Sequence, residues 1–148
     1  MKILFNTPNP LLHGGPATHL YLLERELQER LELVPYQYGR RSDSETMLDK
    51  VFGRLVDLFH LHFMIQSNRP DLIQHNSAFD TKSIFRDAPL ARLAKMHNVP
   101  LLIKVHGSDR KSFGRLHPFV TALRTSLLKN VSCLGVLSEG EKNEFLER

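Results

Sequence analysis

The stretch Leu101-Leu-Ile-Lys-Val-His-Gly-Ser-Asp109 decides the fold class of this chain. Its first five residues form a nearly continuous apolar run, which is typical of a strand buried in a parallel sheet. The run leads directly into the polar turn His106-Gly-Ser-Asp109. Ligands of open parallel sheets bind outside the carboxyl ends of the strands, so this turn is a candidate site segment.

The segments on both sides of this strand alternate between strand and helix patterns. We expect further strands at 1–5, 33–38, 71–75 and 131–137, and helices at 16–31, 45–66, 87–97 and 118–129, with a last helix after Ser138. Such alternation implies βαβ units with right-handed crossovers. The sequence therefore predicts an α/β fold, a doubly wound, Rossmann-like parallel sheet of about five strands, in a single domain over residues 1–148.

Four local signals refine this prediction. Pro35 removes a hydrogen-bond donor from its strand, which places that strand at the edge of the sheet. Asp87 is a candidate N-cap, and Ser138-Glu-Gly-Glu141 has the spacing of a capping box. Apolar residues at helical spacing predict that the helix at 45–66 is long and well buried. They are Leu48, Val51, Phe52, Leu55 and Phe59, followed by His62.

Length and composition indicate an ordinary globular domain. The 148 residues are 41% hydrophobic and 24% charged, which excludes a disordered or fibrous protein. Cys133 is the only cysteine and lies in an apolar run, so we expect a buried side chain, no internal disulfide and a reducing compartment such as the cytoplasm. The apolar start at 1–5 is too short for a signal peptide, and no stretch approaches a membrane-spanning length.

Positive charge is concentrated in one segment of the chain. The formal net charge is +4, and no acidic residue occurs between Asp109 and Glu139. Five cations lie in that span: Arg110, Lys111, Arg115, Arg124 and Lys129. Interleaved with apolar residues, they suit an anionic partner, but a solvated helix face beside a core stripe has the same composition. Both interpretations stay open.

Three segments that follow predicted strands are candidate site segments: Gly14-Gly15, His75-Asn-Ser77 and His106-Gly-Ser-Asp109. Gly14 and Gly15 precede a helix, where backbone N–H groups and the helix dipole favour a phosphate; a plain flexible turn is the alternative. His106 follows the buried strand and could donate a hydrogen bond to a sugar or phosphate oxygen; an interior hydrogen-bonded histidine is the alternative.

Several enzyme classes lack their motifs here. The chain has no G-x-G-x-x-G, no P-loop, no G-x-S-x-G elbow and no H-E-x-x-H. His60 and His62 are two residues apart on a helix and point to different faces. We therefore expect no metal site, no cofactor and no nucleic-acid partner.

Four stretches, taken in order, resemble the N-terminal domain of family-4 glycosyltransferases of the two-domain GT-B type. They are His13-Gly-Gly-Pro-Ala17, Pro70-Asp-Leu-Ile-Gln-His75, Asn98-Val-Pro-Leu-Leu-Ile-Lys-Val-His-Gly-Ser-Asp109 and Leu137-Ser-Glu-Gly-Glu-Lys142. The resemblance implies transfer of a sugar from a nucleotide-sugar donor, with retention of configuration, in a cleft between two Rossmann-like domains. The N-terminal domain of such enzymes chiefly holds the acceptor.

The resemblance also implies roles for particular residues. Gly14 and Gly15 would face the donor diphosphate, and His106, as the catalytic residue, would lie beside the transferred sugar. The acceptor side would be lined by His75, Ser77, Asp109 and Arg86. The acceptor would be a glycan, a lipid-linked sugar or a small molecule, and residues 110–129 would contact an anionic membrane surface at the inner face of the membrane.

Two departures from the family pattern bear on these expectations. The chain has no counterpart of the second domain that binds the nucleotide-sugar, so we expect little or no activity from this chain alone. The region 39–68 is short for the family, with one long helix in place of further elements. A stand-alone phosphate- or nucleotide-binding module and a non-catalytic interaction protein of Rossmann type therefore remain alternative hypotheses.

Overall fold

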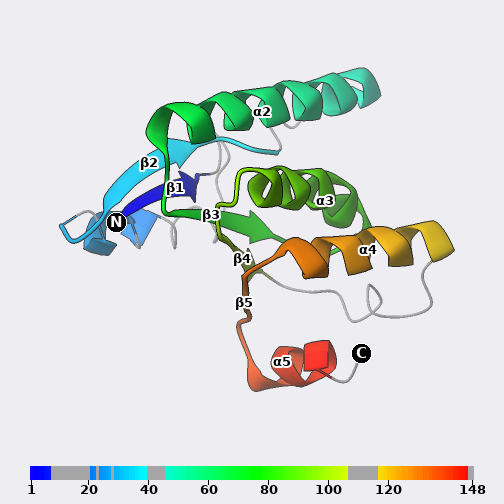
Figure 1. The fold of residues 1–148 in the computed structure, drawn as a ribbon. Coiled ribbons are helices and arrows are strands. Elements are labelled where there is room, and N and C mark those ends of the chain that lie inside the picture. The colour runs from blue at the N-terminus through cyan, green and yellow to red at the C-terminus, as the bar shows by residue number, and fades with distance from the viewer. Residues whose placement is uncertain (8–20, 23, 28, 40–45, 107–116, 147–148) are drawn as a thin grey trace. The chain divides into compact units, whose positions relative to one another are not determined.

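The computed structural model describes residues 1–7, 21–22, 24–27, 29–39, 46–106 and 117–146 (Figure 1). Residues 21–22 and 24–27 are helical, as predicted, and the predicted start of that helix at Pro16 lies outside the described residues. The remaining elements are β1 (Lys2–Asn6), β2 (Glu32–Tyr36), α2 (Met47–Asn68), β3 (Leu72–Ser77), α3 (Thr81–Met96), β4 (Leu101–Val105), α4 (Pro118–Asn130), β5 (Cys133–Gly135) and α5 (Glu139–Leu146).

The five strands form one sheet in the order β2-β1-β3-β4-β5. Strand β1 runs parallel to β2, with Ile3 opposite Leu33, and β4 runs parallel to β5, with Leu102 opposite Cys133. Helices connect these parallel strands, so the predicted Rossmann-like α/β fold in a single domain is confirmed. Strand β2 is at the edge, as Pro35 predicted.

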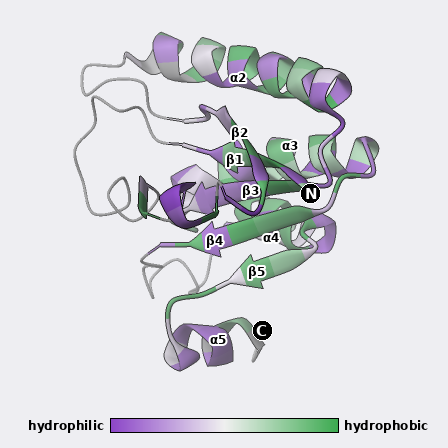
Figure 2. Ribbon diagram, turned by 90° about the vertical axis from the view of Figure 1, so that its left-hand side faces the viewer, coloured by the Kyte–Doolittle hydropathy of each residue, from purple (hydrophilic) through white to green (hydrophobic). Residues whose placement is uncertain are grey.

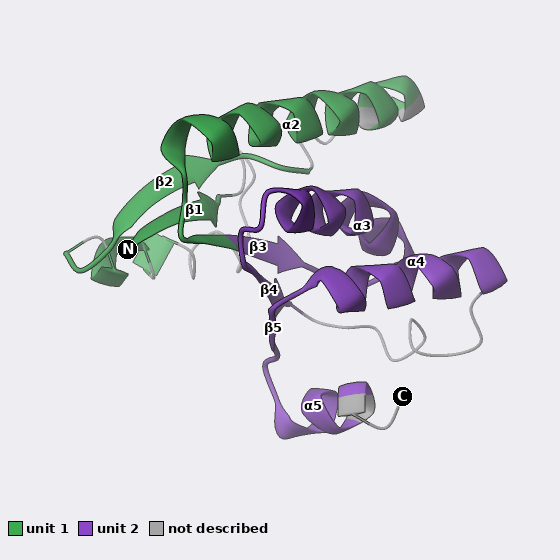
Figure 3. Cartoon of the chain, viewed as in Figure 1, with its two compact units in different colours: residues 1–73 green, residues 74–148 purple. Residues whose placement is uncertain are grey.

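The chain divides into two compact units, residues 1–73 and 74–148 (Figure 3). In the first unit, Leu4 and Phe5 of β1 are buried together with Leu61 and Ile65 of α2. In the second unit, alternate residues of β4 (Leu101, Ile103 and Val105) are fully buried, which agrees with the apolar run in the sequence. Figure 2 shows most of β4 and β5 in the green of hydrophobic residues.

Helix α3 begins earlier than the sequence predicted. Its N-cap is Asp80, whose side chain accepts a hydrogen bond from the backbone N–H of Ser83 at 2.7 Å. The prediction of Asp87 as the N-cap was therefore wrong. Asp87 lies inside the helix and is fully buried, because its carboxylate has hydrogen-bond donors in the protein interior.

Helix α2 does not bury the face that its apolar residues define. Leu48, Val51, Phe52, Leu55 and Phe59 are all exposed, so the prediction of a well-buried helix was wrong. The inward face instead holds Asp57, which is 6% exposed. Its carboxylate accepts a hydrogen bond from the N–H of Gly39 at 3.2 Å, and Arg54 donates to the carbonyl of Gly39. These polar contacts fix which side of the helix turns inward.

Two further predictions concern the C-terminal elements. Cys133 is exposed and not buried, because β5 is a three-residue strand at the second edge of the sheet. The predicted cap at Ser138 is confirmed: its hydroxyl accepts from the N–H of Glu141 at 3.2 Å. The Glu141 carboxylate accepts from the N–H of Leu137, one residue before the position that a capping box uses. Within the described residues no helix is long and apolar enough to span a membrane.

Candidate functional site

Four of the predicted site residues lie in the described part of the chain: His75, Ser77, Arg86 and His106. All four belong to the second unit. Gly14, Gly15 and Asp109 lie outside the described residues, as do Arg110, Lys111 and Arg115 of the basic segment.

The carboxyl ends of β3 and β4 are joined by two hydrogen bonds. The N–H of His106 donates to the carbonyl of Ser77 at 2.8 Å, and His106 Nε2 lies 3.0 Å from Asn76 Oδ1. Gln74 Nε2 also donates to Asn76 Oδ1, at 3.0 Å. An amide oxygen only accepts, so the proton of His106 is on Nε2 in this arrangement. Both the backbone and the ring of His106 are thereby positioned by β3.

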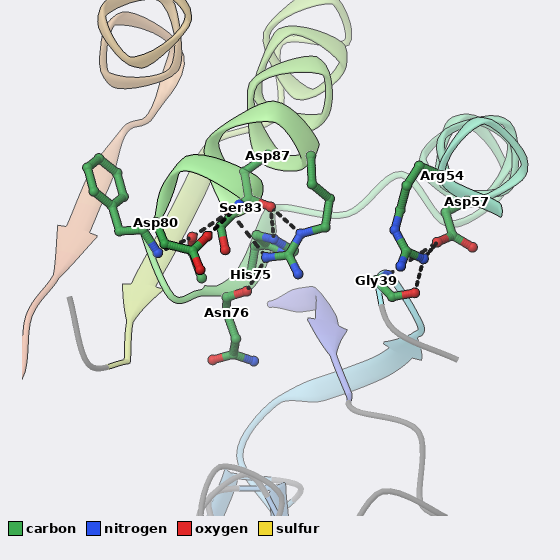
Figure 4. A network of polar contacts seen from close by, with 11 residues as sticks. Gly39, Arg54, Asp57, His75, Asn76, Asp80, Ser83 and Asp87 are labelled. Carbon is green, nitrogen blue, oxygen red and sulfur yellow. Dashed lines mark hydrogen bonds and ion pairs between the residues drawn. The ribbon is translucent and has the colours of Figure 1, made fainter. Parts of the chain in front are cut away.

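A buried polar cluster lies at the junction of β3 and α3 (Figure 4). At its centre is Asp87, with 0% of its side chain exposed. Its Oδ1 accepts from His75 Nε2 at 3.0 Å and from Arg86 Nε at 2.6 Å. Its Oδ2 accepts from Arg86 Nη2 at 3.2 Å and from the hydroxyl of Ser77. His75 is also fully buried, whereas 23% of the Arg86 side chain is exposed.

Burial and pairing set the protonation states in this cluster. Burial lowers the pKa of His75, and this effect outweighs the attraction of Asp87, so the imidazole is neutral at pH 7. Burial alone would raise the pKa of Asp87, but its interactions with His75 and Arg86 lower that pKa to about 2. At neutral pH Asp87 is therefore a carboxylate, with Arg86 as its positive partner and a neutral His75 donating a hydrogen bond.

The cluster positions the backbone of Asn76 through hydrogen bonds. Arg86 Nη2 donates to the carbonyl of Asn76 at 3.4 Å, and the hydroxyl of Ser77 accepts from the N–H of Phe79 at 3.0 Å. The side chain of Asn76 points away from Asp87 (Figure 4). Asp87 thus fixes the segment that, through Asn76, orients His106.

The arrangement is not that of a Ser-His-Asp hydrolase. In such a triad the imidazole lies between the hydroxyl and the carboxylate and takes the proton of the nucleophile. Here Asp87 lies between Ser77 and His75 and accepts a hydrogen bond from each. Ser77 is therefore held by Asp87 and not activated by His75.

Sequence reasoning missed the supporting roles of Asn76, Gln74 and Asp87. Gln74 and Asn76 carried a signal, since residues two apart on a strand share a face and these are polar. Asp87 carried none, because its partners His75 and Ser77 are 12 and 10 residues away and meet it only in the folded chain. Among the described residues no group of His, Cys, Asp and Glu could hold a metal ion.

A family model described as "Glycosyl transferase 4-like domain" matches residues 14–148. No curated protein matches the sequence. One solved structure with some similarity is a PLP-bound C-S lyase from Staphylococcus hominis, at 14% identity and a TM-score of 0.37, over 70% of this chain and 22% of that chain.

Proposed function

The chain belongs to the glycosyl transferase 4-like family, and we propose from this premise that it is the acceptor-binding half of a retaining glycosyltransferase. The match over residues 14–148 is the observation that carries the proposal. The enzyme would transfer a hexosyl group from a nucleotide-sugar to a glycan, lipid or small-molecule acceptor. A second, nucleotide-sugar-binding domain would supply most donor contacts, so this chain alone would have little or no activity.

The main catalytic demand of such a transfer is to stabilise the negative charge that develops on the leaving diphosphate. Backbone N–H groups at Gly14 and Gly15, ahead of a helix, would meet this demand. His106 would contact the transferred sugar through Nδ1. With Nε2–H donating to Asn76, Nδ1 accepts a hydrogen bond from a sugar hydroxyl, in place of the donor role expected from the sequence. Its position supports this role, because its backbone is bonded to Ser77 and its Nε2 to Asn76, so the ring is oriented before a ligand arrives.

On the acceptor side we propose Arg86, which is partly exposed, and Asp109. His75 and Ser77 were predicted from the sequence to line the same side. Because they are 0% and 3% exposed, we expect them to act mainly by holding the Asn76 backbone, through Asp87 and Arg86.

An anionic membrane surface is the proposed location of the acceptor, at the cytoplasmic face. In α4, the exposed apolar residue Leu128 is followed by the exposed cation Lys129, two side-chain types that interfacial segments combine. Sedimentation with liposomes at low salt tests this. Equal binding to anionic and neutral vesicles would contradict it, since the attraction to anionic lipid is electrostatic.

The central test is calorimetric titration of the purified chain with UDP-, GDP- and ADP-sugars, without and with a polypeptide that carries the nucleotide-sugar-binding domain. Binding and transfer that need both polypeptides would support the proposal. Strong binding by this chain alone would overturn it and indicate an autonomous nucleotide-binding module.

Variants of two histidines test the role of His106 within the two-part enzyme. His106→Ala should lower the transfer rate by about a hundredfold or more, as the loss of a preorganised hydrogen bond to the reacting group does. His97 caps the C-terminus of α3, which runs back along the sheet after β3. His97 therefore lies at the amino-terminal ends of the strands, away from the carboxyl ends where His106 lies. His97→Ala is the control and should leave the rate unchanged. Equal rates for the two variants would contradict the role of His106.

A further inference from the structure

Helix α2 presents an exposed, mostly apolar face, interrupted by His62, that the proposed function does not use. Its members are 48% to 68% exposed: Leu48, Val51, Phe52, Leu55, Val56, Phe59 and Phe63. We call this set the apolar stripe. At 3.6 residues per turn it covers an arc of about 140° along four turns of the helix. An amphipathic helix of this kind normally turns such an arc to a core.

The outward position of the apolar stripe is fixed by the opposite side of the helix. Gly53, Asp57, Leu61 and Ile65 follow one another at intervals of four residues and are all buried. Asp57 bonds to Gly39, and Arg54 reaches both the Gly39 carbonyl and the Asp57 carboxylate. Turning the apolar stripe inward would break these contacts and expose Leu61 and Ile65, so a rotation of the helix does not bury it.

The size of the apolar stripe matches a protein–protein interface. The exposed fractions of three phenylalanines, two leucines and two valines correspond to roughly 700 Å² of surface. Contiguous apolar patches of this size mark interaction sites on soluble proteins. A standard interface buries about 800 Å² on each partner.

The charges of α2 favour a protein partner over lipid. Helices that lie in a membrane surface are rich in Lys and Arg on their polar face. Met47–Asn68 contains two acidic residues, Asp49 and Asp57, and two basic ones, Lys50 and Arg54, so their charges cancel. Nothing in this composition attracts an anionic surface.

The spacing of the apolar stripe is self-complementary. Leu48, Phe52, Leu55 and Phe59 are separated by four, three and four residues, the spacing of a helix–helix seam. In an antiparallel pair, residues whose numbers add to 111 lie opposite each other. Three of these pairs are apolar, namely 48 with 63, 52 with 59, and 55 with 56, and the fourth sets Val51 against His60. Two antiparallel copies of α2 related by a two-fold axis would therefore place Leu48 opposite Phe63, and Phe52 opposite Phe59.

The polar border of the apolar stripe fits the same arrangement. Asp49 and His60 lie on one flank, about 60° and 80° from Phe52 around the helix axis. In the antiparallel pair this flank of one copy meets the same flank of the other, with the carboxylate of Asp49 near the imidazole of His60 of the second copy. We propose that this chain forms a two-fold symmetric dimer through antiparallel pairing of α2, centred between Leu55 and Val56.

Sedimentation velocity over a range of protein concentrations tests the dimer. The full chain should sediment as a dimer, and Phe59→Glu should raise the dimer dissociation constant by at least about thirtyfold, as a central hot spot does. Met96→Glu is the matched control, since Met96 of α3 is 71% exposed but lies outside the apolar stripe. It should leave the constant unchanged.

Disulfide cross-linking tests the register, in a Cys133→Ser background that removes the exposed native thiol. Val56→Cys should cross-link to itself, because residues 55 and 56 meet at the two-fold axis. Leu48→Cys should not cross-link to itself but should do so to Phe63→Cys when the two variants are mixed.

Several results would overturn the proposal. A chain that stays monomeric at all concentrations would contradict the dimer. Hydrogen exchange would then show whether the backbone of the apolar stripe is protected within one chain, and neutral vesicles would show whether the stripe binds lipid instead. A dimer that Phe59→Glu leaves intact, or one in which Leu48→Cys cross-links to itself, would also contradict it. None of these results depends on sugar transfer, so the proposed function and the dimer stand or fall separately.

Discussion

Replacing Asp87 with Asn tests the cluster that supports His106. Asn has nearly the same shape as Asp but no charge, and one of its two oxygen positions becomes an NH₂ group. In the folded chain Asp87 Oδ1 accepts two hydrogen bonds and Oδ2 accepts two more. Any orientation of the Asn amide therefore sets a donor against at least one N–H donor of Arg86.

The expected cost can be worked out from the pKa of Asp87. That pKa is lowered from 3.8 to about 2. At 1.36 kcal/mol per pKa unit, the carboxylate is favoured over the neutral acid by about 2 kcal/mol relative to the unfolded chain. The opposed donor adds about 1 kcal/mol. Asp87→Asn should thus lower the free energy of unfolding by about 3 kcal/mol at pH 7, a large part of what a single domain has.

Urea unfolding followed by circular dichroism measures this cost. The midpoint should fall by about 1 to 2 M with an unchanged m-value. Asp80→Asn is the control, because an Asn N-cap replaces Asp with little loss. The folded pKa of Asp87 is depressed, so its stabilising effect is present above pH 4 and disappears as the pH falls towards 2. An Asp87→Asn variant as stable as Asp80→Asn at pH 7 would refute this reasoning.

Three further predictions concern other parts of the chain. The pKa of His75 is lowered in the folded chain, so as the pH falls the unfolded chain takes up this proton before the folded chain does. The free energy of unfolding should therefore decrease as the pH drops below 6.5. His75→Gln should weaken this pH dependence, measured by urea titrations between pH 8 and 5. Thr46 caps α2 in a reciprocal pair with Asp49, and Thr46→Ala should cost about 1 kcal/mol in thermal unfolding; no change in melting temperature would contradict the cap. Leu127 is fully buried in α4 and its neighbour Leu128 is 40% exposed, so Leu127→Ala should cost about 2 to 5 kcal/mol and Leu128→Ala much less; equal costs would contradict the observed packing.

Much of the fold follows from local patterns in the sequence. Residues 101–105 were predicted as a strand from their apolar run, and the structure has β4 at the same residues. Pro35 indicated an edge strand because proline lacks a backbone N–H in any fold, so the sequence alone shows that one ladder hydrogen bond is missing. The helix start at Pro118 and the cap at Ser138 are likewise set by neighbouring residues.

The errors arose where a long-range contact outweighs a local preference. Asp87 has the chemistry of an N-cap, but its charge is satisfied by His75, Ser77 and Arg86, and Asp80 takes the cap instead. Cys133 lies in an apolar run, but that run becomes an edge strand with an exposed first residue. For Asp87 the deciding neighbours His75 and Ser77 come from β3. For Cys133 the deciding fact is the position of β5 at the edge of the sheet.

The sequence by itself determined the α/β class, the strands and most of the helices near their true bounds, the family through its ordered motifs, and His106 at the end of a strand. Only the tertiary structure decided that Asn76 and Gln74 orient His106, that Asp87 is a buried anion, and that α2 turns its apolar stripe outward. Periodicity shows which residues share a face of a helix or strand but not which way that face points. The direction depends on which polar groups find partners inside, as Asp57 does with Gly39.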